Sequence, residues 1–268
     1  MDQKIVFIGG GNMASALIGG LVRAGRPAAH IIVVEPVEAQ RAKLRQAFGV
    51  DAQAAADERL AGAPTVVWAV KPQIFAEAAV PCAAFVRQAL HVSVMAGVRS
   101  LAIGAAVGNP GAAVVRAMPN TPALIGRGIA GLFANPGVTG AQRAEVEALF
   151  APTGATLWVR QEDDLDAVTA ISGSGPAYVF YVLEAMIAAA TELGLSAEQG
   201  RQLALATFDG ATALAAQSAE PPEALRARVT SRGGTTYAAV TSLEDSGVKA
   251  AFVKALRAAR DRAQQLGR

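Results

Sequence analysis

The sequence predicts an α/β protein in two parts, a parallel-sheet domain followed by an all-helical domain. Three observations support this prediction. Short β-branched apolar runs alternate with helix-length segments up to about residue 160. A glycine-rich turn directly follows the first of these runs. After residue 160 the segments have helical character, and none reads convincingly as a strand.

Five apolar runs are expected to form the sheet, and two later runs are expected to extend it. The five are residues 4–8, 31–34, 65–70, 91–94 and 113–116, and the two are residues 129–134 and 155–159. Helices are expected at residues 12–24, 38–48 and 140–150. Strands separated by helix-length segments imply a parallel sheet with helices on its faces. Residues 1–160 therefore form one domain in this prediction.

Four helices are expected in the rest of the chain, at residues 176–193, 197–217, 235–246 and 248–266. Residues 161–268 are thus predicted as a second, all-helical domain. Only 5% of the residues are aromatic, so much of the apolar content is alanine, valine and leucine. Alanine-rich helices can approach closely, which suits packing between helices or between subunits.

The composition excludes several classes of protein. The chain of 268 residues is 52% hydrophobic and 17% charged, so it can bury a core and is not expected to be disordered. A net charge of +2 without a basic run argues against a nucleic-acid partner. No apolar stretch is long and uninterrupted enough for a membrane span. The single cysteine, Cys82, excludes an intrachain disulfide; with no recognisable signal peptide, it favours the reducing cytoplasm. Cys82 is expected to be a small buried hydrophobe.

Residues 9–14, Gly-Gly-Gly-Asn-Met-Ala, fit the G-x-G-x-x-A pattern between a strand and a helix. Gly9 permits the tight turn, Gly11 lets the backbone approach a pyrophosphate, and Ala14 is small enough for helix-against-strand packing. The pattern predicts that residues 1–160 bind a dinucleotide cofactor. The expected contacts of this loop are Ile8, Gly9, Gly10, Gly11, Asn12 and Met13.

Glu35 ends the second expected strand, about 20 residues after the loop. A carboxylate there can bond both hydroxyls of an adenosine ribose and would repel a 2′-phosphate, which favours NADH. Nearby Arg41 is an argument for NADPH, so both cofactors stay open. The alternative interpretation of Glu35 is a solvated acid at a strand end.

Two further segments lie where expected strands end, at the edge where open parallel sheets bind ligands. Lys71 could contact the cofactor or the substrate, or could be a solvated lysine at a helix start. The expected cofactor contacts of the two segments are Ala69, Val70, Lys71 and Pro72, and Ala96 and Gly97.

The positions of the two histidines limit which reaction mechanisms are possible. His30 precedes a strand and His91 begins one, so both are expected at the opposite edge of the sheet. Cysteine and histidine show no metal-ligand spacing, and no metal site is expected. No histidine is placed to activate Ser174 as a nucleophile. This pattern favours hydride transfer from a nicotinamide to an already activated substrate.

Five segments together resemble the pyrroline-5-carboxylate reductase family along nearly the whole chain. They are residues 7–14, 69–72, 116–123, 172–178 and 233–236, and their order and spacing make the resemblance specific. It implies reduction of L-Δ1-pyrroline-5-carboxylate to L-proline with NADPH or NADH, the last step of proline biosynthesis. It also implies a Rossmann domain, a helical substrate-binding and dimerisation domain, and a homodimer assembled into a higher homo-oligomer such as a decamer.

The substrate of that family is a cyclic imine that carries a carboxylate. Gly233, Gly234 and Thr235, at a helix start, can supply the N–H donors that a carboxylate needs. The resemblance places the Thr236 hydroxyl near the ring nitrogen, as the catalytic proton donor or hydrogen-bond partner. It places Asn120 near the nicotinamide. The remaining expected substrate contacts are Ser172, Ser174, Gly175, Pro176 and Ser231.

The chain departs from the family pattern at three positions. Arg232 stands where the family usually has proline, and Ala227 where it often has aspartate. Arg232 either aids an incoming carboxylate or is simply exposed. Many relatives carry a small polar or basic residue at the position of Glu35 and use NADPH, which puts the cofactor preference in doubt.

Two other functions stay open at this stage. A β-hydroxyacid dehydrogenase would need a lysine on the first long helix after the boundary, and residues 176–193 contain none. A non-catalytic NAD(P)-binding sensor is compatible with the altered Arg232.

Overall fold

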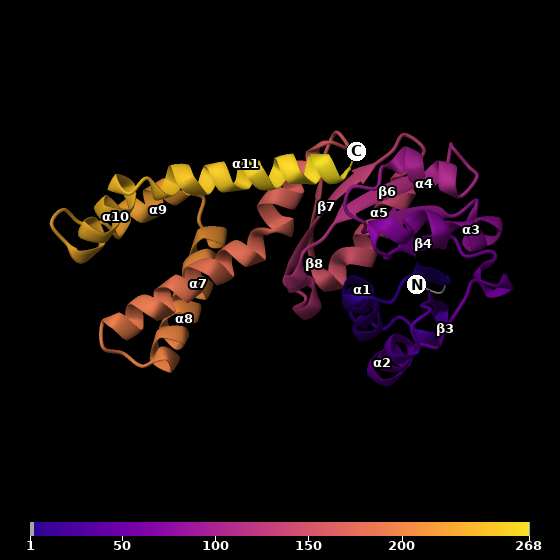
Figure 1. The fold of residues 1–268 in the computed structure, drawn as a ribbon, viewed down its shortest axis with the longest axis horizontal. Helices are drawn as coiled ribbons and strands as arrows, with labels where there is room; N and C mark the ends of the chain where they lie inside the picture. Colours follow the sequence, from indigo (N-terminus) through magenta and orange to yellow (C-terminus); the bar gives the residue numbers. More distant parts are fainter. Residues whose placement is uncertain (1–2, 268) are drawn as a thin grey trace. The chain divides into compact units, whose positions relative to one another are not determined.

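A computed structural model describes residues 3–267 of the chain. It contains two compact units (Figure 1). The first, here called the sheet unit, comprises residues up to Ser174 together with the C-terminal residues from Ala259. The second, the helical unit, is Gly175–Ala258. Each unit is described by itself.

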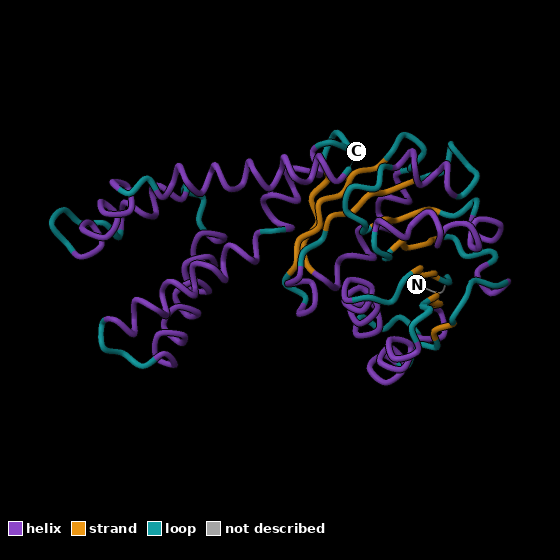
Figure 2. The backbone as a smooth tube through the Cα atoms, viewed as in Figure 1, coloured by secondary structure: helices purple, strands orange, loops and turns teal. Residues whose placement is uncertain are grey.

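An eight-stranded sheet forms the centre of the sheet unit (Figure 2). Its strand order is β3-β2-β1-β4-β5-β6-β7-β8. The strands are β1 (Ile5–Ile8), β2 (Ile31–Val34), β3 (Ala52–Gln53), β4 (Thr65–Trp68), β5 (Leu90–Ser93), β6 (Val114–Met118), β7 (Gly128–Ala134) and β8 (Gly154–Trp158). The predicted α/β fold with a mostly parallel sheet is confirmed.

Two details of the sheet differ from the prediction. Strand β7 pairs with β6 in antiparallel fashion. The connection between them holds only a short 3-10 helix, Thr121–Ile125, and a parallel pairing needs a longer crossover. Strand β3 was not predicted, because its two residues, Ala52 and Gln53, carry no strand pattern.

Side chains of successive strand residues point to opposite faces of the sheet. Ile5 and Phe7 lie in one buried apolar cluster with residues of α1 (Asn12–Arg23), α2 (Glu38–Phe48) and α5 (Gly140–Phe150). Val6 and Ile8 lie in a second cluster, with residues of α3 (Phe75–Val86) and α4 (Ser100–Ala106). The sheet is therefore covered on both faces, as its continuous apolar strands require.

Cys82 belongs to the second cluster and is buried. Burial raises the pKa of its thiol to about 11, so the thiol stays protonated and unreactive at neutral pH. The expectation of a small buried hydrophobe is confirmed.

Shorter helices complete the sheet unit. A five-residue helix, α6 (Asp164–Val168), continues into a π-helical segment, Thr169–Gly173. Four further 3-10 helices are Ala28–His30, Glu58–Leu60, Pro72–Ile74 and Ala151–Thr153.

The helical unit contains α7 (Gly175–Glu192), α8 (Ala197–Gln217), α9 (Pro222–Arg228), α10 (Thr235–Asp245) and most of α11 (Val248–Leu266). The four predicted long helices are present, and α9 is additional. Gly200 allows α8 to approach α7 closely, because a Cβ there would lie 2.7 Å from the Ala190 Cβ. Tyr178 and Phe252 meet edge to face, with ring centroids 5.7 Å apart.

Helix α7 exposes much of its apolar surface. Of its 18 residues only Leu183 is buried, while Phe180 and Tyr181 are 58% and 75% exposed. Leu203 and Leu214 of α8 are exposed as well. Apolar area of this extent on a compact unit marks an interaction surface. Within residues 3–267 no helix combines the length and the apolarity that a bilayer crossing requires.

The compact units divide the chain differently from the predicted domains 1–160 and 161–268. Residues 161–174 lie with the sheet unit, and so does the last part of α11. Residues 161–174 are held against the sheet unit by Glu162, which accepts a hydrogen bond from the Ser100 N–H and forms an ion pair with Arg116. The predicted domain boundary stays a prediction.

The second residue of β5, His91, is fully buried within the sheet. Its Nδ1 accepts a hydrogen bond from Trp68 Nε1 at 3.1 Å, and its Nε2 has no partner among the described residues. Burial lowers its pKa from 6.5 to about 4. The folded protein therefore holds His91 neutral at a pH where the unfolded chain would be protonated.

The first prediction concerns the pH dependence of stability. The pKa of His91 is lower in the folded protein than in the unfolded chain. The contribution of neutral His91 to the free energy of unfolding is therefore fully present above about pH 6.5 and is lost as the pH falls towards 4. Between about pH 7 and pH 5 the free energy of unfolding should fall by about 2 kcal/mol through this group. Urea unfolding across that range measures the loss.

His91→Gln should remove this part of the pH dependence, and His30→Gln should keep it. An unchanged slope in His91→Gln would show that another group is responsible.

Candidate functional site

The glycine-rich loop is held against the ends of the two neighbouring strands. The Gly9 N–H donates to Val34 O at 2.8 Å, and Gly9 has a φ of +96°, which glycine adopts readily. A Cβ at Gly9 would lie 2.6 Å from the Ala69 carbonyl oxygen. The loop therefore needs glycine here both for its turn and for its contact with the segment after β4.

Gly11, in contrast, faces open space. Apart from its two chain neighbours, no atom of the described residues lies within 4 Å of where its Cβ would be, and Gly11 is exposed. Helix α1 begins immediately afterwards, with no side-chain cap and no acidic residue in its first turn. The first N–H groups of the helix, at Asn12 and Met13, lack intrahelical partners and can bind a phosphate.

Glu35, just after β2, turns its carboxylate toward this loop. Oε2 accepts a hydrogen bond from the Gly10 N–H at 2.9 Å, and Oε1 accepts one from the Val37 N–H at 2.9 Å. Glu35 is 8% exposed. The interpretation as a solvated strand-end acid is therefore wrong. Each carboxylate oxygen keeps a further lone pair for a ribose hydroxyl.

The nearby guanidinium of Arg41 is directed to the backbone. Its Nη1 donates to Glu35 O at 2.8 Å and to Pro36 O at 2.7 Å. Its Nη2 pairs with Glu38. These partners already engage the cation that would have favoured a 2′-phosphate.

A cavity of about 400 Å³ lies beside Glu35, at the carboxyl ends of β1, β2 and β4. Its walls are largely apolar, as a planar adenine ring would require. They include Ile8, Gly9, Val34, Pro36, Val70 and Cys82. The structure thus brings several predicted cofactor contacts together. Lys71 is exposed at the start of the next 3-10 helix and does not line this cavity, and Ala69 and Pro72 flank the lining residue Val70.

Two further predicted cofactor contacts, Ala96 and Gly97, lie in the turn after β5. Gly97 has a φ of +76°, and a Cβ there would lie 2.8 Å from the Leu266 carbonyl oxygen. The end of α11 therefore packs directly on this turn. Ala96, beside it, is exposed and accessible.

Asn120 links two segments of the site. Its Nδ2 donates to Ser172 O at 3.1 Å, and its Oδ1 accepts from the Ile129 N–H at 3.0 Å. Gly173 packs against Met118, since a Cβ on Gly173 would lie 2.7 Å from Met118 Cε. The Asn120 amide thus fixes the loop after β6 to the π-helical segment. Its predicted contact with the nicotinamide stays a prediction.

The π-helical segment contains one of the predicted substrate residues and precedes another. The Ser174 N–H donates to Thr169 O at 2.8 Å, the wide turn of a π-helix. The Ser172 hydroxyl donates to Val168 O at 3.0 Å. Short π-helical insertions in α-helices are frequent at functional sites.

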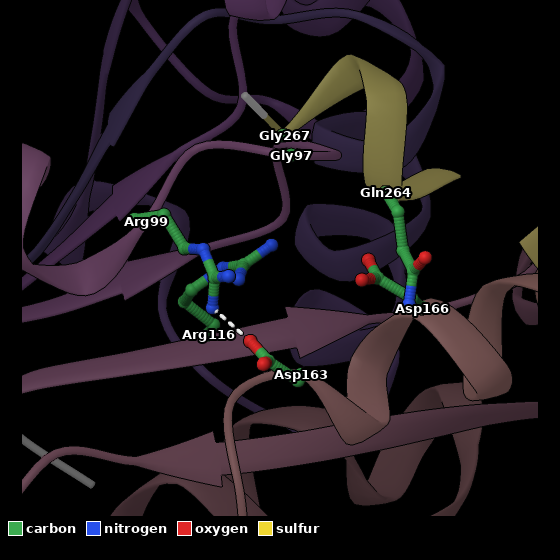
Figure 3. A pocket seen from close by; sticks show the side chains of 7 residues that line it. All are labelled: Gly97, Arg99, Arg116, Asp163, Asp166, Gln264 and Gly267. Carbon is green, nitrogen blue, oxygen red and sulfur yellow. Dashed lines mark hydrogen bonds and ion pairs between the residues drawn. The ribbon is translucent and has the colours of Figure 1, made fainter. Parts of the chain in front are cut away.

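Sequence reasoning missed a cluster of charged side chains next to Gly97. Arg99, Arg116, Asp163, Asp166 and Gln264 surround a cavity of about 80 Å³ (Figure 3). Arg116 is 5% exposed, and burial lowers the pKa of its guanidinium. Burial also raises the pKa of Asp166. One sequence signal could have revealed this cluster: Arg116 interrupts the apolar run that forms β6.

The remaining predicted residues lie in the helical unit. Gly175 and Pro176 form the first turn of α7, where proline is well tolerated. Gly233 has a φ of +76°, and Gly234 is the N-cap of α10. That helix has no side-chain cap and no acidic residue in its first turn, so its first N–H groups can bind an anion. Ser231, Arg232, Thr235 and Thr236 are exposed.

Known proteins and family models match residues of both the sheet unit and the helical unit. Residues 162–266 match the family model of pyrroline-5-carboxylate reductase dimerisation, and residues 4–97 match that of NADP oxidoreductase, coenzyme F420-dependent. The pyrroline-5-carboxylate reductase of Pseudomonas aeruginosa is 44% identical over 264 residues, which cover 98% of this chain and 96% of that protein.

Solved structures agree. A pyrroline-5-carboxylate reductase from Coxiella burnetii superposes with a TM-score of 0.92 at 35% identity, covering 100% of both chains. The Plasmodium falciparum pyrroline carboxylate reductase, solved with NADP bound, gives a TM-score of 0.89 at 28% identity over 100% of this chain and 99% of that one. The chain belongs to the pyrroline-5-carboxylate reductase family.

Proposed function

We propose that this protein reduces L-Δ1-pyrroline-5-carboxylate to L-proline with a nicotinamide cofactor, in the last step of proline biosynthesis. The observation that carries the proposal is the similarity to the Pseudomonas aeruginosa enzyme, which extends over 98% of the chain. The matching part therefore includes the glycine-rich loop of the sheet unit and the start of α10. The sequence-derived cytoplasmic location is part of the same proposal.

The sheet unit would hold NAD(P)H. The N–H groups at the start of α1 would bind the pyrophosphate, and the apolar cavity beside Val70 would take the adenine. The turn at Ala96 and Gly97 would face the nicotinamide half. When bound, the nicotinamide supplies the hydride that the C=N carbon of the substrate accepts.

The start of α10 would hold the substrate carboxylate. The N–H groups of Thr235 and Thr236 carry the partial positive charge of the helix N-terminus, whereas the Gly234 N–H donates to Ser231 O at 3.0 Å. The Thr236 hydroxyl would donate a hydrogen bond to the ring nitrogen of the imine. Ser172, Ser174, Gly175, Pro176, Ser231 and Gly233 would shape the rest of this end.

The alternative enzyme, a β-hydroxyacid dehydrogenase, would need a lysine acid/base on the long helix that follows the sheet domain. Helix α7 contains no lysine, which disfavours that function here. A sensor without catalysis would bind the cofactor but would not oxidise it in the presence of the imine.

The exposed apolar residues of α7 and α8 support a homo-oligomer, because a second copy would remove them from water. Part of the chain matches the family's dimerisation model. The homodimer, and its further assembly into a decamer, are our proposal.

We further propose that NADH is preferred over NADPH. The Glu35 carboxylate is fixed by two backbone N–H groups, and its neighbours Val34 and Pro36 line the apolar cavity proposed for the adenine. A 2′-phosphate would meet this negative charge, and Arg41 is already engaged by Glu38 and two carbonyl oxygens.

Initial rates with pyrroline-5-carboxylate against NADH and NADPH test the function directly. We expect oxidation of the cofactor that depends on the imine, with proline as the product. Cofactor binding without turnover would instead favour the sensor.

The second prediction concerns the catalytic hydroxyl. Thr236→Ala should lower kcat by roughly tenfold to a hundredfold, because a proton donor at the imine nitrogen acts only in the transition state. The affinity for NADH should change little. Steady-state kinetics and a cofactor titration check both parts, with Thr241→Ala, in the middle of α10, as the matched control. Wild-type turnover in Thr236→Ala would remove this residue from the mechanism.

The third prediction concerns cofactor preference. Glu35→Gln keeps an oxygen acceptor but removes the charge, so the ratio of kcat/KM for NADPH to that for NADH should rise roughly tenfold. Glu58→Gln makes the same charge change at an exposed site outside the cavity and should leave the ratio unchanged. A wild-type enzyme that already prefers NADPH would contradict the role given to Glu35.

A further inference from the structure

One acidic side chain, Glu162, joins segments of the sheet unit that lie far apart in the sequence. It lies between β8 and α6, and its side chain is 16% exposed. Its Oε1 accepts hydrogen bonds from the Ser100 N–H at 2.7 Å and from Arg116 Nη1 at 3.1 Å. Its Oε2 accepts one from the Ser100 hydroxyl at 3.2 Å, and Arg99 Nη1 lies 3.7 Å from it.

The bond to Ser100 matters because of where α4 begins. This helix has seven residues, and its N-cap, Arg99, supplies no side-chain cap. The first N–H of a helix has no intrahelical partner, and a buried one needs an acceptor. Ser100 is buried, and Glu162 provides that acceptor from 62 residues away.

The segment fixed in this way is the turn between β5 and α4, residues 94–99. Its start is held by the bond from the Met95 N–H to Ser93 Oγ at 3.2 Å. Its middle, at Gly97, is covered by Leu266. Glu162 holds its end. The turn belongs to no strand or helix, so these contacts contribute to its conformation, together with the bond from the Val94 N–H to Trp68 O at 3.0 Å and the ion pair of Arg99 with Asp163.

Glu162 has a second role that can be separated from the first. It is the carboxylate that pairs with Arg116 in the described part of the chain. Arg116 is buried, and its Nε has no hydrogen-bond partner there. Removing the carboxylate would take away the hydrogen-bonded partner of this buried cation and leave only the weaker attraction of Asp166, which is destabilising. Figure 3 shows Arg116 beside Arg99 and Asp163, next to Gly97.

We propose that Glu162 is a positioning residue of the cofactor site, which fixes the turn containing Ala96 and Gly97 for the nicotinamide half. It acts through Ser100 and touches neither cofactor nor substrate. This inference rests on the proposed function, because the assignment of Ala96 and Gly97 to the cofactor belongs to it.

Two substitutions separate positioning from stability. Glu162→Gln keeps an oxygen that can accept from the Ser100 N–H but removes the charge opposite Arg116. Glu162→Ala removes both. Glu147→Ala is the matched control, since it deletes an exposed carboxylate of the same unit that accepts a hydrogen bond from Trp158 Nε1 at 2.5 Å.

The dissociation constant of NADH is measured by titration calorimetry and the Tm by thermal unfolding, for all three variants and the full-length wild type. Both Glu162 variants should have a lower Tm. NADH should bind roughly tenfold more weakly to Glu162→Ala, because the turn must be ordered on binding. Glu162→Gln and Glu147→Ala should bind NADH within about twofold of the wild type. The KM for pyrroline-5-carboxylate at saturating NADH should not change.

The proposal is overturned if the NADH affinity follows the Tm, falling equally in both Glu162 variants, or if it changes in neither. If Glu162→Ala does not fold, it is combined with Arg116→Met, which removes the unpaired charge, and compared with Arg116→Met/Glu162→Gln. In the Arg116→Met background, the variant with Glu162→Ala should still bind NADH more weakly than the variant with Glu162→Gln. Equal NADH affinity in these two double variants would contradict the proposal. A wild type that binds NADH but does not reduce the imine would contradict the proposed function alone.

Discussion

The parallel, in-register pairing of four strands determines where the loops proposed to bind the cofactor lie. Ile8 is level with Val34 on one side and with Trp68 on the other, and Trp68 is level with Ser93. The four strands therefore end together, and the segments that follow them leave from one edge of the sheet. A glycine loop, a carboxylate and two turns from distant parts of the sequence meet there without any additional structure to bring them together.

This constraint also explains how much of the site the sequence could predict. The glycine loop, Glu35 and the turns at Val70 and Gly97 each follow an apolar run directly, so their place at the sheet edge follows from their place in the chain. The orientation of Glu35 did not follow, because its bond to Gly10 depends on how the loop folds back over β2. The apolar pattern also predicted most of the long helices. It missed the twelve-residue α3, which contains Pro81, and the elements too short to carry a period.

The contacts that the sequence could not predict join residues without any common motif. Asn120 and Ser172 are 52 residues apart, and Glu162 and Ser100 are 62 apart. No periodicity links them, since each pair forms only when a loop after β6 or β5 meets the segment around α6. The antiparallel β7 contributes to this arrangement, because Ile129 at its start donates to the same Asn120 that binds Ser172. Pattern analysis finds the elements of this site, whereas the side chains that hold the elements together require the structure.

A contribution to stability is a poor explanation for the presence of the charged cluster next to Gly97. A buried arginine paired with a carboxylate rarely stabilises a protein more than apolar residues of the same size would. Arg116 lies on a strand whose neighbours Val114, Val115 and Ala117 are all buried and apolar, so an apolar side chain would fit its position. The carboxylate of Glu162 would then be needed only for the start of α4, where a neutral acceptor would serve. The arginine therefore has a different consequence: its Nη1 donates to the same Glu162 oxygen that accepts from the Ser100 N–H, and so it directs the carboxylate inward. Since that N–H marks the end of the turn at Ala96 and Gly97, the acceptor oxygen of Glu162 secures the geometry of the loop, while its charge balances the buried Arg116.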